Sequence, residues 1–217
     1  MRILLATRNP GKLVELRRIT EAAGLAGVEI VGLADVPDFP EAPETGATFA
    51  ENALAKARDA AVATGLPAIA DDSGITVDAL NGMPGIFSAR WSGTHGDDEA
   101  NLRLLLAQTS DVPDDRRGAA FVCAAALVTP EGADGVSPAE AAAEGTGPGR
   151  TVVHGTWRGT LLRAPAGTNG FGYDPIFEPE GETRSSAELS SEEKDAASHR
   201  GRALRALVPH LQALAGA

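Results

Sequence analysis

The sequence predicts a mixed β-sheet with helices in an α/β or α+β arrangement. Helical and extended patterns alternate in the first part of the chain, whereas hairpin-like extended runs follow later. The 217 residues are enough to bury a substantial core, either as one large domain or as two lobes that share a sheet.

The first two elements are a strand over residues 3–6 and a helix that follows a polar turn. Asn9 suits the N-cap of that helix, and Pro10 fits its first position because a backbone N–H there has no partner within the helix. Apolar residues then recur at helical spacing, so one face of the helix is expected to meet a core. These residues are Leu13, Leu16 and Ile19.

The turn between this strand and this helix is a candidate anion site. Free N–H groups and the positive end of the helix dipole point at it, while Lys12 adds a cation and Thr7 a hydroxyl. The pattern is not a Walker A loop, because Leu13 replaces the Ser or Thr that holds magnesium. From these residues alone, phosphate binding and an ordinary strand-to-helix turn are both open interpretations.

The remaining elements follow from capping signals and periodicity. Thr48 and Glu51 have the spacing of a capping box and begin a helix that runs to about Thr64. Another helix covers residues 97–108, and helical sequence returns from about Ser191 to the C-terminus. Extended runs are expected at residues 28–33, 66–70, 75–80, 119–129 and 151–162, with a loop at 165–179 and a flexible hairpin insertion at 131–150.

Two adjacent carboxylates, Asp71 and Asp72, are expected to end the buried strand at residues 66–70. Such a pair needs solvent, a cation or a shared proton. On an extended backbone their side chains point to opposite sides, so one faces a given cleft and the other can brace the loop. A carboxylate here can bind Mg²⁺ or accept a proton from water, and an Asp-Ser-Gly turn is the structural alternative. Glu44 or Glu41 can supply a second metal-facing carboxylate.

A glycine-rich loop near residue 170 is a candidate site for a planar base. Its glycines permit close approach of a ligand, on which Phe171 or Tyr173 can stack while Asp174 accepts a hydrogen bond from a ring N–H. The alternative is that the aromatic side chains pack inward and pin the loop.

Lys194, His199 and Arg200 form a cationic set in an otherwise acidic chain. On one uninterrupted helix, positions 194 and 199 diverge by about 140°, so a break is needed for them to converge. Ser198 can cap a new helix, which places His199 and Arg200 at the start of a separate last helix. The other histidines lack metal-ligand spacing and are expected to be structural: His95, His154 and His210.

Composition narrows the classes of function. A net charge of −11 opposes attraction to nucleic acid or an anionic membrane, whereas local cations or a metal still admit a small anionic ligand. No apolar segment reaches membrane-spanning length and none resembles a leader, so we expect a cytoplasmic protein. The single cysteine, Cys123, lies in an apolar run and is expected to be a buried side chain rather than a catalytic thiol.

Six blocks of sequence, taken in order, closely resemble the Ham1/RdgB family, the inosine/xanthosine triphosphate pyrophosphatases that cleanse the nucleotide pool. The likeness spans nearly the whole chain, and the blocks together are far more specific than any one of them. They are Thr7-Arg8-Asn9-Pro10-Gly11-Lys12; Glu44-Thr45-Gly46 with residues 48–53; residues 66–74; residues 84–90; residues 170–177; and Lys194 with Ser198-His199-Arg200-Gly201.

The resemblance implies one domain over residues 1–217, with a mixed, strongly twisted sheet, flanking helices and two lobes around a central cleft. It implies a homodimer that uses Mg²⁺ to hydrolyse ITP, dITP, XTP and dXTP to the monophosphate and pyrophosphate, without nucleic-acid or membrane partners. It assigns Asp72 as general base and metal ligand and Glu44 as the second metal ligand. The other implied substrate-binding residues are Thr7, Arg8, Asn9, Pro10, Gly11, Lys12 and Ser73 for the phosphates, and Phe171, Gly172, Tyr173, Asp174, Lys194, His199 and Arg200 for the nucleoside.

These assignments agree with the chemistry of the reaction. Attack of water on phosphorus, with pyrophosphate leaving, requires charge neutralisation and an aligned nucleophile, which cations, a metal and a carboxylate base provide. Inosine and xanthosine carry a 6-oxo acceptor where adenosine carries an amino donor, so a cation facing that position favours the first two. A Maf-like nucleotide pyrophosphatase and a noncatalytic nucleotide sensor remain alternative interpretations.

Overall fold

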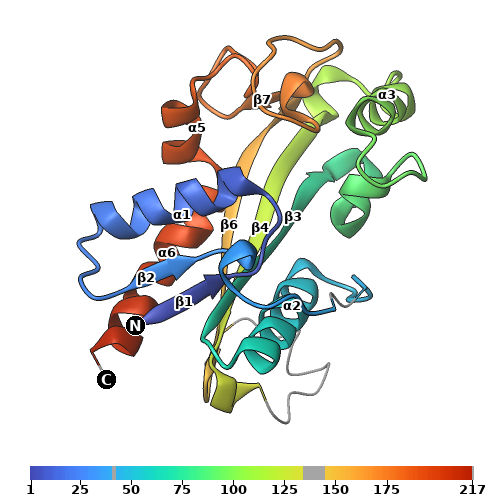
Figure 1. Cartoon of the computed structure of the whole chain (residues 1–217). Helices are drawn as coiled ribbons and strands as arrows, with labels where there is room; N and C mark the ends of the chain where they lie inside the picture. Colours follow the sequence, from blue (N-terminus) through green and yellow to red (C-terminus); the bar gives the residue numbers. More distant parts are fainter. Residues whose placement is uncertain (41–42, 134–144, 217) are drawn as a thin grey trace. The chain divides into compact units, whose positions relative to one another are not determined.

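The computed structural model describes residues 1–40, 43–133 and 145–216, and Figure 1 shows the course of the chain by colour. The chain forms two compact units. The first unit contains Met1–Asp72, Cys123–Gly155 and Arg200–Ala217, and the second unit contains Ser73–Val122 and Thr156–His199. Three long strands contribute residues to both units: β3 (Ala68–Val77), β4 (Gly118–Val128) and β6 (Arg150–Leu161).

The strands form one seven-stranded mixed sheet in the order β2-β1-β3-β4-β6-β5, with β7 paired to β6. The four short strands among the described residues are β1 (Arg2–Leu5), β2 (Glu29–Val31), β5 (Gly145–Gly147) and β7 (Phe177–Pro179). β1 runs parallel to β2 and β3, with Leu4 opposite both Val31 and Ala68. β6 runs antiparallel to β5 and β7. The combination confirms the predicted mixed sheet with flanking helices.

Helices cover both faces of the sheet in the first unit. α1 (Pro10–Ala22) and α6 (His199–Ala215) lie on one face and α2 (Phe49–Thr64) on the other (Figure 1). The α1 and α6 side buries large aliphatic side chains such as Leu16 and Leu204. The α2 side buries alanines such as Ala53 and Ala57, whose small side chains let that helix approach the strands closely.

Both N-terminal helix caps lie where the sequence predicts. Asn9 Oδ1 accepts a hydrogen bond from the Gly11 N–H at 2.9 Å. Thr48 Oγ1 accepts from the Glu51 N–H at 3.2 Å, as in a capping box. The return bond differs, because the Glu51 carboxylate accepts from the Ala47 N–H at 2.7 Å.

The second unit has an aromatic core. The Phe177 ring meets Phe121 and Trp157 edge-on, with ring centroids 4.7 Å and 5.6 Å away. α3 (Asp98–Gln108) adds Leu102 and Leu105 to this core. In the part of the chain that the structure describes, the short 3₁₀ helices are η1 (Leu33–Asp35), η2 (Asp78–Leu80), η3 (Gly85–Arg90), η4 (Asp114–Arg116), η5 (Pro130–Gly132) and η6 (Asp174–Ile176).

β3 differs from the prediction because it does not stop at its acidic residues. It continues through Asp71, Asp72 and the two residues after them to Val77, so the predicted break and the Asp-Ser-Gly turn are wrong. Gly74 allows the continued strand to pass close to η3. A Cβ at this position would lie 2.3 Å from Ser88 Oγ, so only glycine lets the strand pass this close to η3.

The C-terminal helical region is broken as predicted. α5 (Ser191–Ala197) is followed by Ser198, which has an extended backbone, and α6 begins at the next residue. The loop expected at 165–179 contains η6 and β7. Of the hairpin insertion expected at 131–150, residues 134–144 lie outside the described part. Within the described residues, no helix combines the length and the apolar character needed to cross a membrane.

Candidate active site

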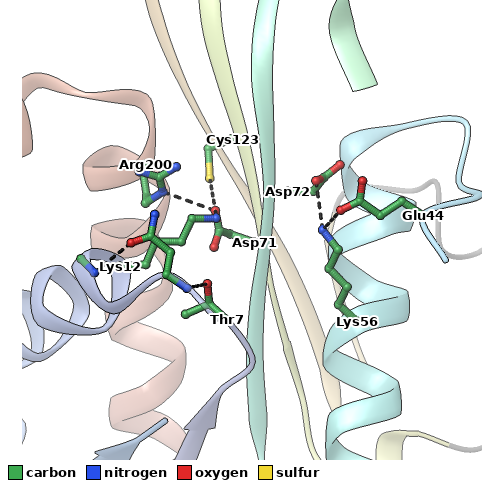
Figure 2. A network of polar contacts seen from close by, with 10 residues as sticks. Thr7, Lys12, Glu44, Lys56, Asp71, Asp72, Cys123 and Arg200 are labelled. Carbon is green, nitrogen blue, oxygen red and sulfur yellow. Dashed lines mark hydrogen bonds and ion pairs between the residues drawn. The ribbon is translucent and has the colours of Figure 1, made fainter. Parts of the chain in front are cut away.

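Asp71 and Asp72 lie on opposite sides of β3 in the first unit, as expected for neighbours on an extended strand. In Figure 2, Asp71 points toward Lys12 and Arg200, and Asp72 points toward Lys56 and Glu44. Both carboxylates are buried, with 6% and 9% of their residue surfaces exposed. The two aspartates therefore serve different groups of residues.

Asp72 is held by two residues of α2. Its Oδ2 accepts a hydrogen bond from Asn52 Nδ2 at 3.0 Å, and its Oδ1 accepts one from Lys56 Nζ at 3.1 Å. Burial raises the pKa of Asp72 above its usual value, although Lys56 and Asn52 oppose the shift. A carboxylate with a raised pKa is a stronger base than one in water.

Lys56 also forms an ion pair with Glu44, so one ammonium group bridges two carboxylates. Burial lowers the pKa of Lys56, but Asp72 and Glu44 outweigh this and raise it overall. The cation at this position shows that the pair of carboxylates favours positive charge.

The same two carboxylates fit a magnesium site. Mg²⁺ prefers oxygen ligands and usually combines one or two carboxylates with water and substrate phosphates. Among the described residues, no group of three or more His, Cys, Asp or Glu side chains is arranged to hold a metal. Asp72 and Glu44 match the one or two carboxylates of a magnesium site that also takes water and phosphate ligands. Glu41, the alternative to Glu44, lies outside the described residues.

Asp71 organises two cations on the other side of β3. Its Oδ2 lies 2.7 Å from Lys12 Nζ and 3.3 Å from Arg200 Nε. Burial favours protonation, but Lys12 and Arg200 outweigh it and hold the pKa of Asp71 well below its usual range. Cys123 lies against the same oxygen, with Sγ at 3.9 Å, and burial raises the pKa of its thiol. Cys123 is therefore a buried thiol, as expected, and Asp71 braces Lys12 and Arg200.

The turn before α1 is held by its own side chains. Thr7 Oγ1 accepts a hydrogen bond from the Asn9 N–H at 3.2 Å, and Asn9 caps the helix. The other residues assigned to the phosphates have accessible surface: Arg8, Pro10 and Gly11 are exposed, and Ser73, on β3, is half-buried.

The two aromatic candidates near residue 170 in the second unit have different environments. Phe171 is 57% exposed, whereas Tyr173 is 5% exposed and belongs to the apolar core. The Tyr173 hydroxyl donates to the Ser88 carbonyl at 2.8 Å, and burial raises its pKa. Gly172 N–H donates to Asp98 Oδ2 at 2.9 Å. Phe171 is thus exposed for stacking, whereas the Tyr173 ring packs inward, which is the alternative considered for this loop.

Asp174 is the polar centre of this loop, and it is 4% exposed. Its carboxylate accepts from the Phe171 N–H at 2.9 Å and from Ser186 Oγ at 2.8 Å, and it forms an ion pair with Lys194. The loop requires glycine at position 170, where φ is +80° and a Cβ would lie 2.2 Å from Asp174 Oδ2. The result is a carboxylate and an ammonium beside an exposed aromatic ring.

The three residues of the predicted cationic set have different neighbours. Lys194 pairs with Asp174, and Arg200 pairs with Asp71. His199 is 7% exposed and stacks on Phe121, with centroids 4.9 Å apart and ring planes 13° apart.

Sequence reasoning missed Asn52, Lys56 and Ser186. Asn52 and Lys56 are four residues apart and lie on one face of α2, which the helical periodicity could have indicated. Lys56 carried a further signal, because the chain has three lysines and the other two were already candidates. Ser186 follows another serine between Arg184 and Ala187, and nothing in this local pattern distinguishes it.

Comparison with known proteins gives a consistent result. The model of the Ham1 family matches residues 3–210. A protein of Nocardia farcinica named dITP/XTP pyrophosphatase is 63% identical over 99% of this chain and 96% of its own length. A protein of the same name from Streptomyces coelicolor is 58% identical over 99% of both chains.

Solved structures agree with the sequence matches. A crystal structure of a nucleoside-triphosphatase / dITP/XTP pyrophosphatase from Mycobacterium abscessus is 60% identical, with a TM-score of 0.76, over 97% of this chain and 100% of the other. A HAM1 protein from Coxiella burnetii is 38% identical, with a TM-score of 0.82, over 98% and 99% of the two chains. The chain therefore belongs to the Ham1 family.

Proposed function

We propose that this chain is a Mg²⁺-dependent dITP/XTP pyrophosphatase that cleanses the nucleotide pool. It hydrolyses ITP, dITP, XTP and dXTP to the nucleoside monophosphate and pyrophosphate. The observation that carries the proposal is the pair Asp72 and Glu44 bridged by a cation, in a chain 63% identical to a protein named for this activity. Action on free nucleotides is the reason to expect it in the cytoplasm.

The reacting end of the substrate is assigned to the first unit. Asp72 and Glu44 are the oxygen donors for Mg²⁺, which when bound neutralises charge on the phosphates. Asp72 accepts the proton of the water that attacks the α-phosphorus, and its raised pKa suits it to that role. The bond from the α-phosphorus to the bridging oxygen then breaks, and pyrophosphate leaves. Lys12, which shares Asp71 with Arg200, supplies positive charge for the phosphate oxygens.

The base is assigned to groups of the second unit. Phe171 offers an exposed ring for stacking, Asp174 an acceptor and Lys194 donors. A 6-oxopurine presents a ring N–H beside an oxygen, which matches an acceptor beside a donor. Adenine presents a bare ring nitrogen beside an amino group and reverses both, so its polar atoms lie unpaired against Asp174 and Lys194.

A substrate panel tests the proposal. Purified protein is incubated with dITP, XTP, dGTP, dATP and a modified pyrimidine triphosphate, with Mg²⁺ or with EDTA, and pyrophosphate and orthophosphate are measured separately. The proposal expects Mg²⁺-dependent release of pyrophosphate, much faster from dITP and XTP than from dATP. Preference for the pyrimidine would identify a Maf-like activity, and binding without turnover would identify a nucleotide sensor.

We also propose a homodimer, which the family resemblance implies. Light scattering during size-exclusion chromatography gives the mass directly, and a mass near that of one 22.2 kDa chain at working concentrations would contradict it.

A further inference from the structure

The carboxylate of Asp174 has little acceptor capacity left for a ligand. A carboxylate offers about four acceptor positions, two on each oxygen. On Oδ2, one is taken by the Phe171 N–H and another by the Lys194 ammonium. On Oδ1, one is taken by the Ser186 hydroxyl. The contacts of the described residues leave one position, on Oδ1.

Ser186 is buried beside Asp174 and donates to its carboxylate. It is 0% exposed, and its Oγ lies 2.8 Å from Asp174 Oδ1 and 3.2 Å from the Asp174 carbonyl. A hydroxyl has one proton to donate, and the carboxylate oxygen is the nearer and the charged acceptor. The donors on the two oxygens also fix how the carboxylate is turned about its Cβ–Cγ bond.

We propose that Ser186 is a positioning residue for substrate choice, which acts by restricting Asp174 to one hydrogen bond from a purine edge. The inference rests on the proposed function and addresses how guanine is disfavoured. Hypoxanthine presents one N–H at this edge. Guanine presents the same N–H and an adjacent amino group, so a second donor would be buried without an acceptor. Such an unpaired donor costs binding free energy.

The neighbouring serine provides a matched control. Ser185 is 1% exposed, and its Oγ donates to the Ala166 carbonyl at 2.6 Å. Ser185→Ala therefore removes a buried hydroxyl from the same segment without touching Asp174. Ser186→Ala removes the hydroxyl that restricts Asp174 and lets the carboxylate turn to offer a second acceptor.

The test compares kcat/KM for dITP and dGTP in the wild type, Ser186→Ala and Ser185→Ala. The expected result is a fall of about ten-fold in the dITP to dGTP ratio for Ser186→Ala, mainly through a lower KM for dGTP. The ratio for Ser185→Ala is expected to stay within about two-fold of the wild type, because no contact to Asp174 changes. A general loss of packing would lower kcat/KM for dITP and for dGTP by the same factor and leave their ratio unchanged.

An unchanged ratio in a folded Ser186→Ala protein would overturn the inference. If that variant does not fold, Ser186→Cys replaces it, because a thiol is similar in size and a weak donor, and an unchanged ratio there has the same meaning. If the wild type releases no pyrophosphate from dITP, the proposed function fails. Calorimetric binding of dIMP and dGMP to the wild type and Ser186→Ala then decides the role of Ser186 separately.

Discussion

Lys56→Met tests whether the Lys56 ammonium group stabilises the folded protein by pairing with Asp72 and Glu44. Methionine keeps most of the apolar stem and removes the charge. At 3.1 Å and an effective dielectric constant of about 20, the attraction between Lys56 and Asp72 amounts to about 5 kcal/mol. The Lys56 side chain is 28% exposed, so solvent and relaxation offset part of this. We expect the free energy of unfolding in EDTA to fall by about 2 kcal/mol.

The assay is urea unfolding of the wild type and the variant at about pH 7, in EDTA and in Mg²⁺. The difference in the free energy of unfolding between wild type and variant is expected to be smaller in Mg²⁺ than in EDTA, because the ion replaces the lost positive charge beside Asp72 and Glu44. Arg58→Met is the matched control, since Arg58 is exposed on the same helix and the change removes the same charge. Its expected effect is within about 0.5 kcal/mol of zero.

The pH dependence of Lys56→Met has a definite sign. Burial already raises the pKa of Asp72 above 3.8, and loss of Lys56 raises it further. At pH values between 3.8 and the pKa of Asp72 in the folded protein, folded Asp72 keeps a proton that Asp72 of the unfolded chain has released. The free energy of unfolding therefore falls as the pH rises through this range. The loss is therefore larger at about pH 7 than at about pH 4. The reasoning would be refuted if Lys56→Met lost the same free energy of unfolding in EDTA as in Mg²⁺. It would also be refuted if Arg58→Met lost as much as Lys56→Met.

Three further substitutions separate the other groups. Asp72→Asn is expected to keep the fold, by circular dichroism, while pyrophosphate release from dITP falls about a thousand-fold; near-normal turnover would remove Asp72 from the role of base. Asp71→Asn leaves Lys12 and Arg200 without their carboxylate and is expected to lower the free energy of unfolding by about 3 kcal/mol near neutral pH. Because the pKa of Asp71 is depressed, that difference in urea unfolding should shrink as pH falls below the ordinary value of 3.8, and a constant difference would contradict the assignment. Phe171→Ala is expected to raise the KM for dITP about ten-fold by loss of stacking, with an unchanged melting temperature because the ring is 57% exposed; a lower melting temperature with unchanged KM would show that the ring only packs.

Local chemistry made much of the fold predictable. The caps at Asn9 and Thr48 and the break at Ser198 each depend on a few neighbouring residues, and the structure confirms all three. The end of β3 was not predictable in this way. Asp71 and Asp72 look like the end of a strand when their partners are unknown, and those partners lie far away in the sequence.

For the candidate site, the sequence singled out residues and their chemical types. Lys12, Asp72 and Asp174 were candidates because they lie within recognisable blocks. What the sequence left open was the pairing, because the partners lie far apart in the chain: Lys12 and Asp71 by 59 positions, and Arg200 and Asp71 by 129. The inward turn of Tyr173 was open for the same reason, since its hydroxyl partner is the distant Ser88 carbonyl.

All three lysines of the chain pair with a buried aspartate: Lys12 with Asp71, Lys56 with Asp72, and Lys194 with Asp174. Reductive methylation with ¹³C-formaldehyde would thus place one NMR label on each group of residues and leave only the N-terminal amine besides. Three resonances would then report separately on the surroundings of Asp71, Asp72 and Asp174 during a titration. Because the protein has three lysines, each labelled resonance can be assigned to one of these aspartates and its surroundings.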